Sequence, residues 1–224
     1  MNDFSADLLK NDHIFQHLSD EDLQGLAQLA VHKHYQKGEI ICFQGDLWPH
    51  TLYLVLGKLN WVMLAPDGKR QVVLRPKAGD VVWGHSLFDE DPMPASLEVV
   101  EDSDTWLWHG RDLMPLLLTN VDAAWAVNRY LIRTLRQARD FIYGFAFHPV
   151  AGRLAKLLLT HYDPREGEAT PRDLTLDEMA NSVGTTRELV SKTLHQFAAQ
   201  GMIDINRVEI VFKDRIKLAE MTHE

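Results

Sequence analysis

The chain has 224 residues, long enough for one large or two small domains, and 46% of them are hydrophobic, which suffices for buried cores. No apolar run approaches the roughly 20 residues that a membrane-spanning helix needs, and the first residues lack both the basic and the apolar part of a signal peptide. The single cysteine, Cys42, excludes an intrachain disulfide framework and a four-cysteine iron–sulfur cluster. We therefore expect a cytoplasmic protein with no membrane partner.

The charge argues against strong nonspecific binding to nucleic acid. The formal net charge is −9, and acidic residues also outnumber basic ones from Phe145 onward. Because nucleic-acid affinity comes largely from neutralising phosphates, a DNA site in this chain has to depend on where a few cations stand. The candidate cations are Arg187, Lys192, Arg207 and Lys213.

Residues 3–31 are predicted to form one or two short helices. Ser19 and the three acidic residues after it are typical of a helix N-cap and an acidic first turn. The apolar positions that we expect to be buried in this segment are Leu8, Leu9, Ile14, Phe15 and Leu18.

From His32 to His109 the pattern changes to short strands separated by glycine or proline turns, which is typical of an antiparallel sandwich or roll. One of these turns is predicted at Leu56-Gly57. Cys42, between two apolar residues, is interpreted as a small buried residue and not as a redox switch. The predicted strands are 32–35, 39–44, 51–56, 58–64, 70–75, 81–83, 96–100 and 104–108.

A helix is predicted from Arg111 to about Gly144. Its apolar residues follow an alternating three-four spacing over more than three heptads, which favours a seam between two parallel chains over packing within one chain. Asn128 within the seam would set the register of the two chains. The predicted seam consists of Val121, Ala124, Asn128, Leu131, Leu135, Ala138 and Ile142. A further helix from Val150 to His161 and a polar surface loop from Asp163 to Pro171 follow.

Residues 174–203 predict two short helices joined by a turn at Gly184. Thr175 with Glu178, and Thr185 with Glu188, each have the spacing of a capping box, and Gly201 is placed to end the second helix. The apolar stripe of the second helix is predicted to be Leu189, Val190, Leu194, Phe197 and Ala198. Two short strands, 203–205 and 208–212, surround Asn206-Arg207. This order predicts a winged helix-turn-helix, whose second helix enters the major groove of DNA.

The outward face of the second helix carries residue types that can contact DNA. Arginine can donate two bonds to guanine, glutamate can accept from cytosine N4, and serine can bond to either. The alternative is an exposed, solvated face on an ordinary helical hairpin. The predicted contact residues are Thr185, Thr186, Arg187, Glu188, Ser191, Lys192 and Arg207.

Several motifs together resemble the Crp–Fnr family of transcription regulators. They are Ala146-Phe147, Gly152-Arg-Leu-Ala155, Leu174-Thr-Leu-Asp-Glu-Met-Ala180, Val183-Gly-Thr-Thr-Arg-Glu-Leu-Val-Ser-Lys192 and Gly201-Met-Ile203. The resemblance implies an α+β fold with an antiparallel, jelly-roll-like β-roll sensor (1–110), a dimerisation helix (111–146) and a C-terminal winged helix-turn-helix domain (147–224). It also implies a homodimer on an inverted repeat, RNA polymerase as a further partner, and no enzymatic activity.

The predicted roll resembles a cyclic-nucleotide-binding domain at Lys37-Gly-Glu39, Gln44-Gly-Asp46, Tyr53-Leu-Val-Leu-Gly57 and Gly79-Asp-Val-Val-Trp-Gly84. The resemblance implies a glutamate for the ribose hydroxyl and an arginine for the cyclic phosphate, but His85 stands in place of the glutamate and Met93 or Pro94 in place of the arginine. No Lys or Arg occurs between Ala78 and Gly110. A buried phosphate without a cation is costly, so we expect an effector other than cyclic AMP. The candidate pocket residues are Gly84, His85, Ser86, Met93, Ala95, Ser96 and Arg139.

Three alternatives remain open at this point. Arg139, Arg75 or Lys77 could supply a relocated phosphate clamp, or His32 and His34, which face one way on a strand, could hold haem for gas sensing. The winged helix could serve protein contacts only. A cupin-like enzyme would need clustered histidines, whereas the histidines here are scattered. No metal site is expected, and the sequence requires no cofactor.

Overall fold

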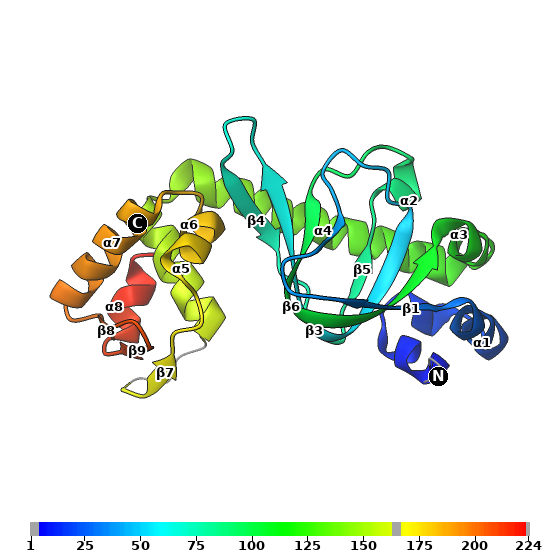
Figure 1. The fold of residues 1–224 in the computed structure, drawn as a ribbon, viewed down its shortest axis with the longest axis horizontal. Helices are drawn as coiled ribbons and strands as arrows, with labels where there is room; N and C mark the ends of the chain where they lie inside the picture. The colour runs from blue at the N-terminus through cyan, green and yellow to red at the C-terminus, as the bar shows by residue number, and fades with distance from the viewer. Residues whose placement is uncertain (1–4, 163–166, 223–224) are drawn as a thin grey trace. The chain divides into compact units, whose positions relative to one another are not determined.

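The computed structural model describes residues 5–162 and 167–222. The first part of the predicted loop at 163–171 therefore lies outside the described residues. Among those described, no helix combines the length and the apolar character needed to cross a membrane. The chain divides into two compact units, one of Met1–Gly68 and Val72–Thr134, the other of Lys69–Gln71 and Leu135–Glu224. Figure 1 shows the elements of both.

The N-terminal unit is built around one antiparallel sheet. Strands run in the order β1-β6-β3-β4, while β2 pairs with β6 and β5 pairs with β3. The strands are β1 (Val31–Tyr35), β2 (Ile40–Cys42), β3 (His50–Leu64), β4 (Arg70–Leu74), β5 (Val81–Trp83) and β6 (Ser96–His109). The predicted antiparallel β-roll is confirmed.

Short helices cover one end of this sheet. They are the 3-10 helices η1 (Ala6–Asn11) and η2 (Phe15–His17) and the α-helices α1 (Asp20–Leu29), α2 (Ser86–Asp89) and α3 (Gly110–Thr119). Helices α1 and α3 lie side by side (Figure 1). Ser19 caps α1 as predicted, because its side chain accepts from the N–H of Asp22. Leu9, Ile14, Phe15 and Leu18 are buried as expected, but Leu8 is exposed.

The prediction of separate strands on either side of Gly57 is wrong. Strand β3 continues through Gly57, and its pairing with β6 shifts register on both sides of that residue. Gly57 has φ +97°, and a Cβ there would overlap the side chain of Ser103. The glycine therefore serves a bulge and a close approach of two strands, not a turn. The strands predicted at 96–100 and 104–108 are likewise one strand, β6.

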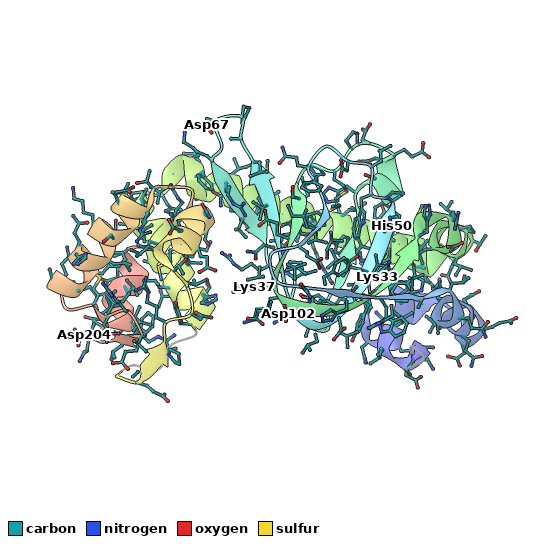
Figure 2. All side chains as sticks on the ribbon, in the orientation of Figure 1. Lys33, Lys37, His50, Asp67, Asp102 and Asp204 are labelled. Carbon is teal, nitrogen blue, oxygen red and sulfur yellow. The ribbon has the colours of Figure 1, made fainter. Side chains whose placement is uncertain are left out.

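Two apolar cores hold this unit together. One lies under the helices and includes Trp108, whose indole Nε1 donates to the backbone oxygen of Leu26 at 2.7 Å. The other fills the roll and includes Cys42, which is 4% exposed and whose thiol pKa burial raises to about 12. Cys42 is therefore buried, as predicted from the sequence. A surface turn is tied to the sheet where the N–H of Lys37 donates to Asp102 Oδ1 at 2.8 Å (Figure 2).

The single helix predicted from Arg111 is in fact two helices. Helix α3 ends at Thr119 and α4 (Val121–Phe147) begins two residues later. Asn120 makes the break, since its Oδ1 accepts from the N–H of Ala123 and its Nδ2 donates to the backbone oxygen of His17. Side-chain bonds to nearby backbone groups favour a cap over a continuous helix.

Helix α4 has a buried face along its first half and an exposed face that continues into its second half. Ala123, Ala126 and Val127 are buried against the N-terminal unit. The exposed face carries large apolar side chains that follow a four-three spacing, in which Asn128 and Arg139 occupy the two remaining positions. Water does not favour such a stripe unless another surface covers it. Its members are Val121, Trp125, Ile132, Leu135 and Ile142, all at least half exposed.

The C-terminal unit is a small helical domain with a three-stranded sheet. Its strands run in the order β7-β9-β8, all antiparallel. Its elements are α5 (Val150–Tyr162), β7 (Ala169–Pro171), α6 (Leu176–Val183), α7 (Arg187–Ala199), β8 (Ile203–Ile205), β9 (Glu209–Phe212) and α8 (Arg215–Glu220). The predicted helices and the wing hairpin are confirmed. Strand β7, which was predicted as loop, and helix α8 were missed.

Candidate nucleic-acid interface

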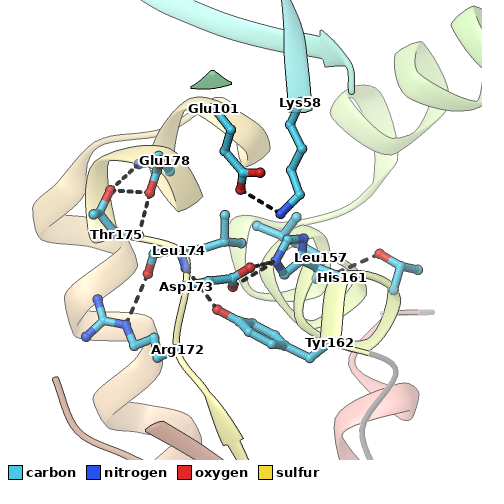
Figure 3. Close-up of polar contacts among 11 residues, drawn as sticks. Lys58, Glu101, Leu157, His161, Tyr162, Arg172, Asp173, Leu174, Thr175 and Glu178 are labelled. Carbon is cyan, nitrogen blue, oxygen red and sulfur yellow. Dashed lines mark hydrogen bonds and ion pairs between the residues drawn. The ribbon is translucent and has the colours of Figure 1, made fainter. Parts of the chain in front are cut away.

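The first helix of the helix-turn-helix begins as predicted. Thr175 Oγ1 accepts from the N–H of Glu178 at 3.2 Å, and Glu178 Oε2 accepts from the N–H of Thr175 at 2.7 Å (Figure 3). These reciprocal bonds form a complete capping box. Gly184 ends the helix with φ +66°, a conformation that glycine adopts at little cost. The glycine turn between α6 and α7 is therefore confirmed.

The second capping box was placed one residue too early. The N-cap of α7 is Thr186, whose Oγ1 accepts from the N–H of Leu189, and not Thr185. The C-terminal end is as predicted: Gly201 has φ +72°, its N–H donates to Ala198, and the N–H of Met202 donates to Phe197. This pair of bonds is a Schellman motif.

Helix α7 buries one side and exposes the other. Val190, Leu194 and Phe197 are buried as predicted. Leu189 is 39% exposed and Ala198 only half-buried, so these two do not belong to the fully buried stripe. Thr193 takes a buried place instead, where its hydroxyl donates to the backbone oxygen of Leu189.

A shallow groove lies along the exposed side of α7. Four of the predicted contact residues lie in it, and Thr185 and Thr186 stand at the start of the same helix. The groove is lined by Leu176, Arg187, Glu188, Ser191, Lys192, His195, Gln196 and Ala199. Gln196, Ala199 and Leu176 were missed. The first two could have been found by extending the spacing of Glu188 and Lys192 by further turns of the helix.

Two acidic residues shape the charge of this groove. Arg187 Nη1 donates to Asp177 Oδ2 at 3.1 Å, an ion pair between α7 and the first turn of α6. The pKa of Glu188 is lowered by hydrogen bonds from its own backbone N–H and from the Thr186 hydroxyl, so its carboxylate stays charged and can accept. His195 Nδ1 lies 2.7 Å from the backbone oxygen of Ser191.

The wing is a tight hairpin that presents Arg207 and Val208 at its tip. Asn206 Oδ1 accepts from the N–H groups of Val208 and Glu209. Arg172 Nη1 donates to the backbone oxygen of Asn206 at 3.0 Å, which ties the hairpin to the segment before α6. Arg207 is exposed and lies outside the groove residues, on a different element.

A second cluster of polar contacts fixes the chain where it enters α6 (Figure 3). His161 Nε2 lies 2.9 Å from Asp173 Oδ1, and the N–H of Leu174 donates to the Tyr162 hydroxyl. Burial raises the pKa of Tyr162 to about 12, so the hydroxyl keeps its proton. Helix α5 thus holds the start of the helix-turn-helix in place.

Most of the candidate effector-pocket residues are buried, and two of them already have hydrogen-bond partners. Met93 is 2% exposed and belongs to the core of the roll. Ser86 and Ser96 are buried, and their hydroxyls already bond: Ser86 to Trp48 and Asp91, and Ser96 to Gln44. Gly84 and Ala95 are buried and His85 is exposed. Arg139 pairs with its neighbour Asp140 on α4.

The described histidines do not gather into a group that could hold a metal ion. Among the described residues, no three His, Cys, Asp or Glu side chains are grouped so that they could hold a metal ion. His32 and His34 do face the same way, since both approach Asp104 Oδ1, at 3.5 and 3.0 Å.

Comparisons with known proteins agree with this geometry. Residues 32–120 match the cyclic nucleotide-binding domain family, and residues 152–221 match the Crp-like helix-turn-helix domain family. The chain belongs to the Crp–Fnr family of transcription regulators. Several relatives are named as transcriptional regulators. The groove on α7 lies within the residues that match the Crp-like helix-turn-helix domain.

Two relatives align over almost the whole chain. The CRP-like cAMP-activated global transcriptional regulator of Mycobacterium tuberculosis is 25% identical over 218 residues, 95% of this chain and 97% of the relative. The cyclic AMP receptor protein of Thermus thermophilus is 27% identical over 214 residues, 95% and 98% of the two chains. Among solved structures, the c-di-GMP responsive regulator CLP of Xanthomonas campestris shares the fold, with a TM-score of 0.75, 17% identity and coverage of 87% and 99%. FixK2 of Bradyrhizobium japonicum does so with a TM-score of 0.72, 22% identity and coverage of 86% and 96%.

Proposed function

We propose that this protein is a cytoplasmic, homodimeric transcription regulator that binds an inverted repeat through the groove on α7. The observation that carries the proposal is the meeting of Arg187, Glu188, Ser191 and Lys192 on one exposed face of the second helix of a winged helix-turn-helix. These side chains can read guanine and cytosine edges and contact phosphate. Arg207 on the wing is proposed as a backbone contact. RNA polymerase is the expected partner, and the proposal includes no enzymatic activity.

The exposed apolar stripe of α4 supports the dimer. The predicted seam residues Asn128, Leu131 and Ala138 are exposed along with Val121, Leu135 and Ile142, while Ala124 is half-buried. Trp125 and Ile132, which the predicted seam leaves out, are 61% and 50% exposed on the face opposite Ala123 and Ala126. We therefore place the centre of the interface at Trp125, Asn128, Ile132 and Leu135. A parallel pair of such helices would give the two DNA-binding domains two-fold symmetry.

For the effector, we propose a ligand other than cyclic AMP. Both relatives described above are named for cyclic AMP, which favours the alternative of a nucleotide-responsive regulator. Against it stand the buried Met93, the internal bonds of Ser86 and Ser96, and the carboxylates of Asp89, Glu90 and Asp91 in a loop without Lys or Arg. A phosphate entering this loop would meet repulsion and no paired cation.

Selection from random DNA duplexes tests the proposed function directly. The full chain is incubated with the pool, bound duplexes are recovered, and the enriched sequences are read. We expect an inverted repeat whose half-sites are about one helical turn, roughly 34 Å, apart. An unenriched pool, or enrichment of a single half-site by a monomer, would contradict the proposal. Sedimentation of the same preparation supplies the oligomeric state independently.

A further inference from the structure

Asp177 and Arg187 are ten residues apart in sequence but form an ion pair between the two helices of the helix-turn-helix. Arg187 Nη1 lies 3.1 Å from Asp177 Oδ2, with both side chains about 60% exposed (60% and 62%). Arg187 is the first residue of α7 and lines the groove, and Asp177 follows Leu176, which lines the same groove from α6. The pair therefore stands at the rim of the surface proposed to meet DNA.

The geometry of a guanidinium decides what this pair can do. Arginine carries five N–H donors in a planar fork, and the contact with Asp177 engages the donor at Nη1. The edge formed by Nε and Nη2 can still donate two parallel bonds. Guanine presents the matching pair of acceptors, O6 and N7, in the major groove. A carboxylate on one edge of the fork thus leaves the other edge oriented for a guanine.

The carboxylates of the neighbouring residues Glu178 and Glu188 interact with other groups. Glu178 accepts from the backbone and hydroxyl of Thr175 in the capping box. The pKa of the Glu188 carboxyl is lowered by its own backbone N–H and by the Thr186 hydroxyl. Asp177 is the carboxylate that the structure pairs with Arg187.

We infer that Asp177 is a positioning and specificity-determining residue for DNA recognition. It holds the Arg187 guanidinium in the orientation that reads a guanine, and it places a negative charge where a misdocked backbone phosphate would stand. The inference rests on the proposed function, because it assigns a role within the same site. It goes further in predicting two effects of opposite sign when Asp177 is removed: weaker preference for one base pair, and tighter binding to unrelated DNA.

The two effects have separate physical causes. Loss of the partner lets Arg187 adopt other rotamers, so that bonds to guanine cost more conformational entropy. Loss of a negative charge strengthens attraction to any phosphate backbone, whatever its sequence. Exposed ion pairs add little to folding stability, so the substitution should leave the domain folded.

The experiment compares four full-length proteins on three duplexes. The proteins are the wild type, Asp177→Ala, Asp177→Asn and the control Asp204→Asn, which removes the same charge from an exposed ion pair with Lys213 in the wing (Asp204 is labelled in Figure 2). The duplexes are the selected repeat, the repeat with the Arg187-dependent guanine pair changed symmetrically, and an unrelated sequence. The measurement is the dissociation constant by fluorescence anisotropy at fixed salt, after circular dichroism has shown that each variant is folded.

We expect Asp177→Ala to lower the preference for the guanine pair about 3- to 10-fold and to tighten binding to unrelated DNA about 2- to 5-fold. Asp177→Asn, which keeps a neutral acceptor for Arg187, should tighten unrelated binding while retaining most of the preference. Asp204→Asn should leave the preference unchanged. Two further full-length proteins, Arg187→Ala and the double variant Arg187→Ala/Asp177→Ala, complete the comparison. In the Arg187→Ala background, Asp177→Ala should no longer alter the preference.

The outcomes separate this inference from the proposed function. If the wild type selects a repeat but Asp177→Ala keeps the full preference for the guanine pair, the positioning role is wrong. It is also wrong if Asp177→Ala lowers that preference equally in the wild-type and Arg187→Ala backgrounds. In both cases the proposed function as a DNA-binding regulator is retained. If Asp204→Asn reduces the preference as much as Asp177→Ala, the effect is one of net charge and the inference is overturned. If the wild type selects no sequence, the proposed function itself is wrong and the role of Asp177 is excluded with it.

Discussion

The guanidinium carbon of Arg153 lies 4.6 Å from the centre of the Phe145 ring. The same side chain donates from Nε to the backbone oxygen of Val183 and from Nη1 to that of His148. Burial lowers the pKa of Arg153, but the group keeps its charge because its pKa starts so high. One arginine of α5 therefore joins the end of α4 to the last residue of α6.

The aromatic ring of Phe145 also determines what the turn of the helix-turn-helix can tolerate. A Cβ on Gly184 would overlap the Phe145 ring, whereas a Cβ on Gly201 would meet nothing within 4 Å. Both glycines have positive φ, +66° and +72°. Gly201→Ala therefore measures only the free-energy cost of placing an alanine in the left-handed conformation. Gly184→Ala measures that cost together with overpacking against the Phe145 ring.

We predict that Gly184→Ala destabilises the C-terminal unit more than Gly201→Ala does. The left-handed conformation costs an alanine about 1–2 kcal/mol, and overpacking adds about 1–3 kcal/mol at Gly184 only. Hydrogen exchange of peptides covering 176–199 measures the loss. All six tryptophans lie between positions 48 and 125 in the N-terminal unit. Tryptophan emission therefore reports on the N-terminal unit and serves as an internal reference that this unit is unchanged. Equal protection in the two variants would mean that Phe145 does not pack on the turn.

Arg187→Ala and Arg207→Ala should weaken DNA binding in different ways. Loss of a base contact at Arg187 should cost about 1–3 kcal/mol on the selected repeat and relax preference at one symmetric position. Loss of a phosphate contact at Arg207 should weaken all duplexes alike and reduce the slope of log affinity against log salt by about one for each site. Anisotropy titrations at several salt concentrations distinguish them. An unchanged sequence preference in Arg187→Ala would rule out its assignment as a base reader.

A charge on the apolar stripe of α4 should separate the proposed dimer. Ile132→Asp and Leu135→Asp each place a carboxylate at the centre of the proposed interface, where desolvation would be costly. Leu131→Asp tests a position that belongs only to the seam predicted from the sequence. The matched control is Ile216→Asp, an equally drastic change at a 74% exposed position on α8. Sedimentation velocity should show monomers for the stripe variants and dimers for the control. Intact dimers in all variants would place the subunit interface elsewhere.

Cyclic AMP should give no heat of binding at millimolar concentration. The loop between Gly84 and Ser96 has no Lys or Arg. Met93 or Pro94 stands at the position of the family's arginine, and the side chain of Met93 is in the core. Isothermal titration with cyclic AMP and cyclic GMP provides the measurement. A micromolar dissociation constant that is lost in Arg139→Ala would instead establish a phosphate clamp supplied from α4.

His50 should make the N-terminal unit less stable in mild acid. Burial lowers the pKa of His50, and the charges of His109 and Arg111 lower it further. Its Nδ1 has no hydrogen-bond partner among the described residues. His50 takes up a proton near pH 6.5 in the unfolded chain but only at lower pH in the folded chain. The stability that neutral His50 contributes is therefore fully present above about pH 6.5 and is lost as the pH falls below that value.

The test of this pH dependence is urea unfolding followed by tryptophan emission at about pH 7.5 and about pH 5.5. His50→Gln should reduce the loss of stability between the two values. His13→Gln, a change at an exposed position, is the control and should leave that loss as in the wild type. A variant at His50 that loses as much stability as the wild type would contradict the prediction.

Features that depend on a few consecutive residues could be predicted from the sequence. Thr175 and Glu178 are three residues apart, so the capping box needs no distant partner, and Gly184 and Gly201 have conformations that few other residues accept. Helix α7 was placed with an error of one residue at its N-cap, because Thr185 and Thr186 can both cap and only the folded backbone selects between them. The fold, the family and the exposed face of α7 all followed from such local signals.

What only the tertiary structure decided depends on residues that are far apart in the chain. Gly57 was predicted as a turn because its role comes from the approach of Ser103 on another strand. The break at Asn120 depends on a bond to His17, and the exposure of Trp125 and Ile132 depends on which face of α4 the N-terminal core covers. The pairing of Asp177 with Arg187 depends on the angle between α6 and α7. Sequence spacing records none of these, because each is a contact made by packing.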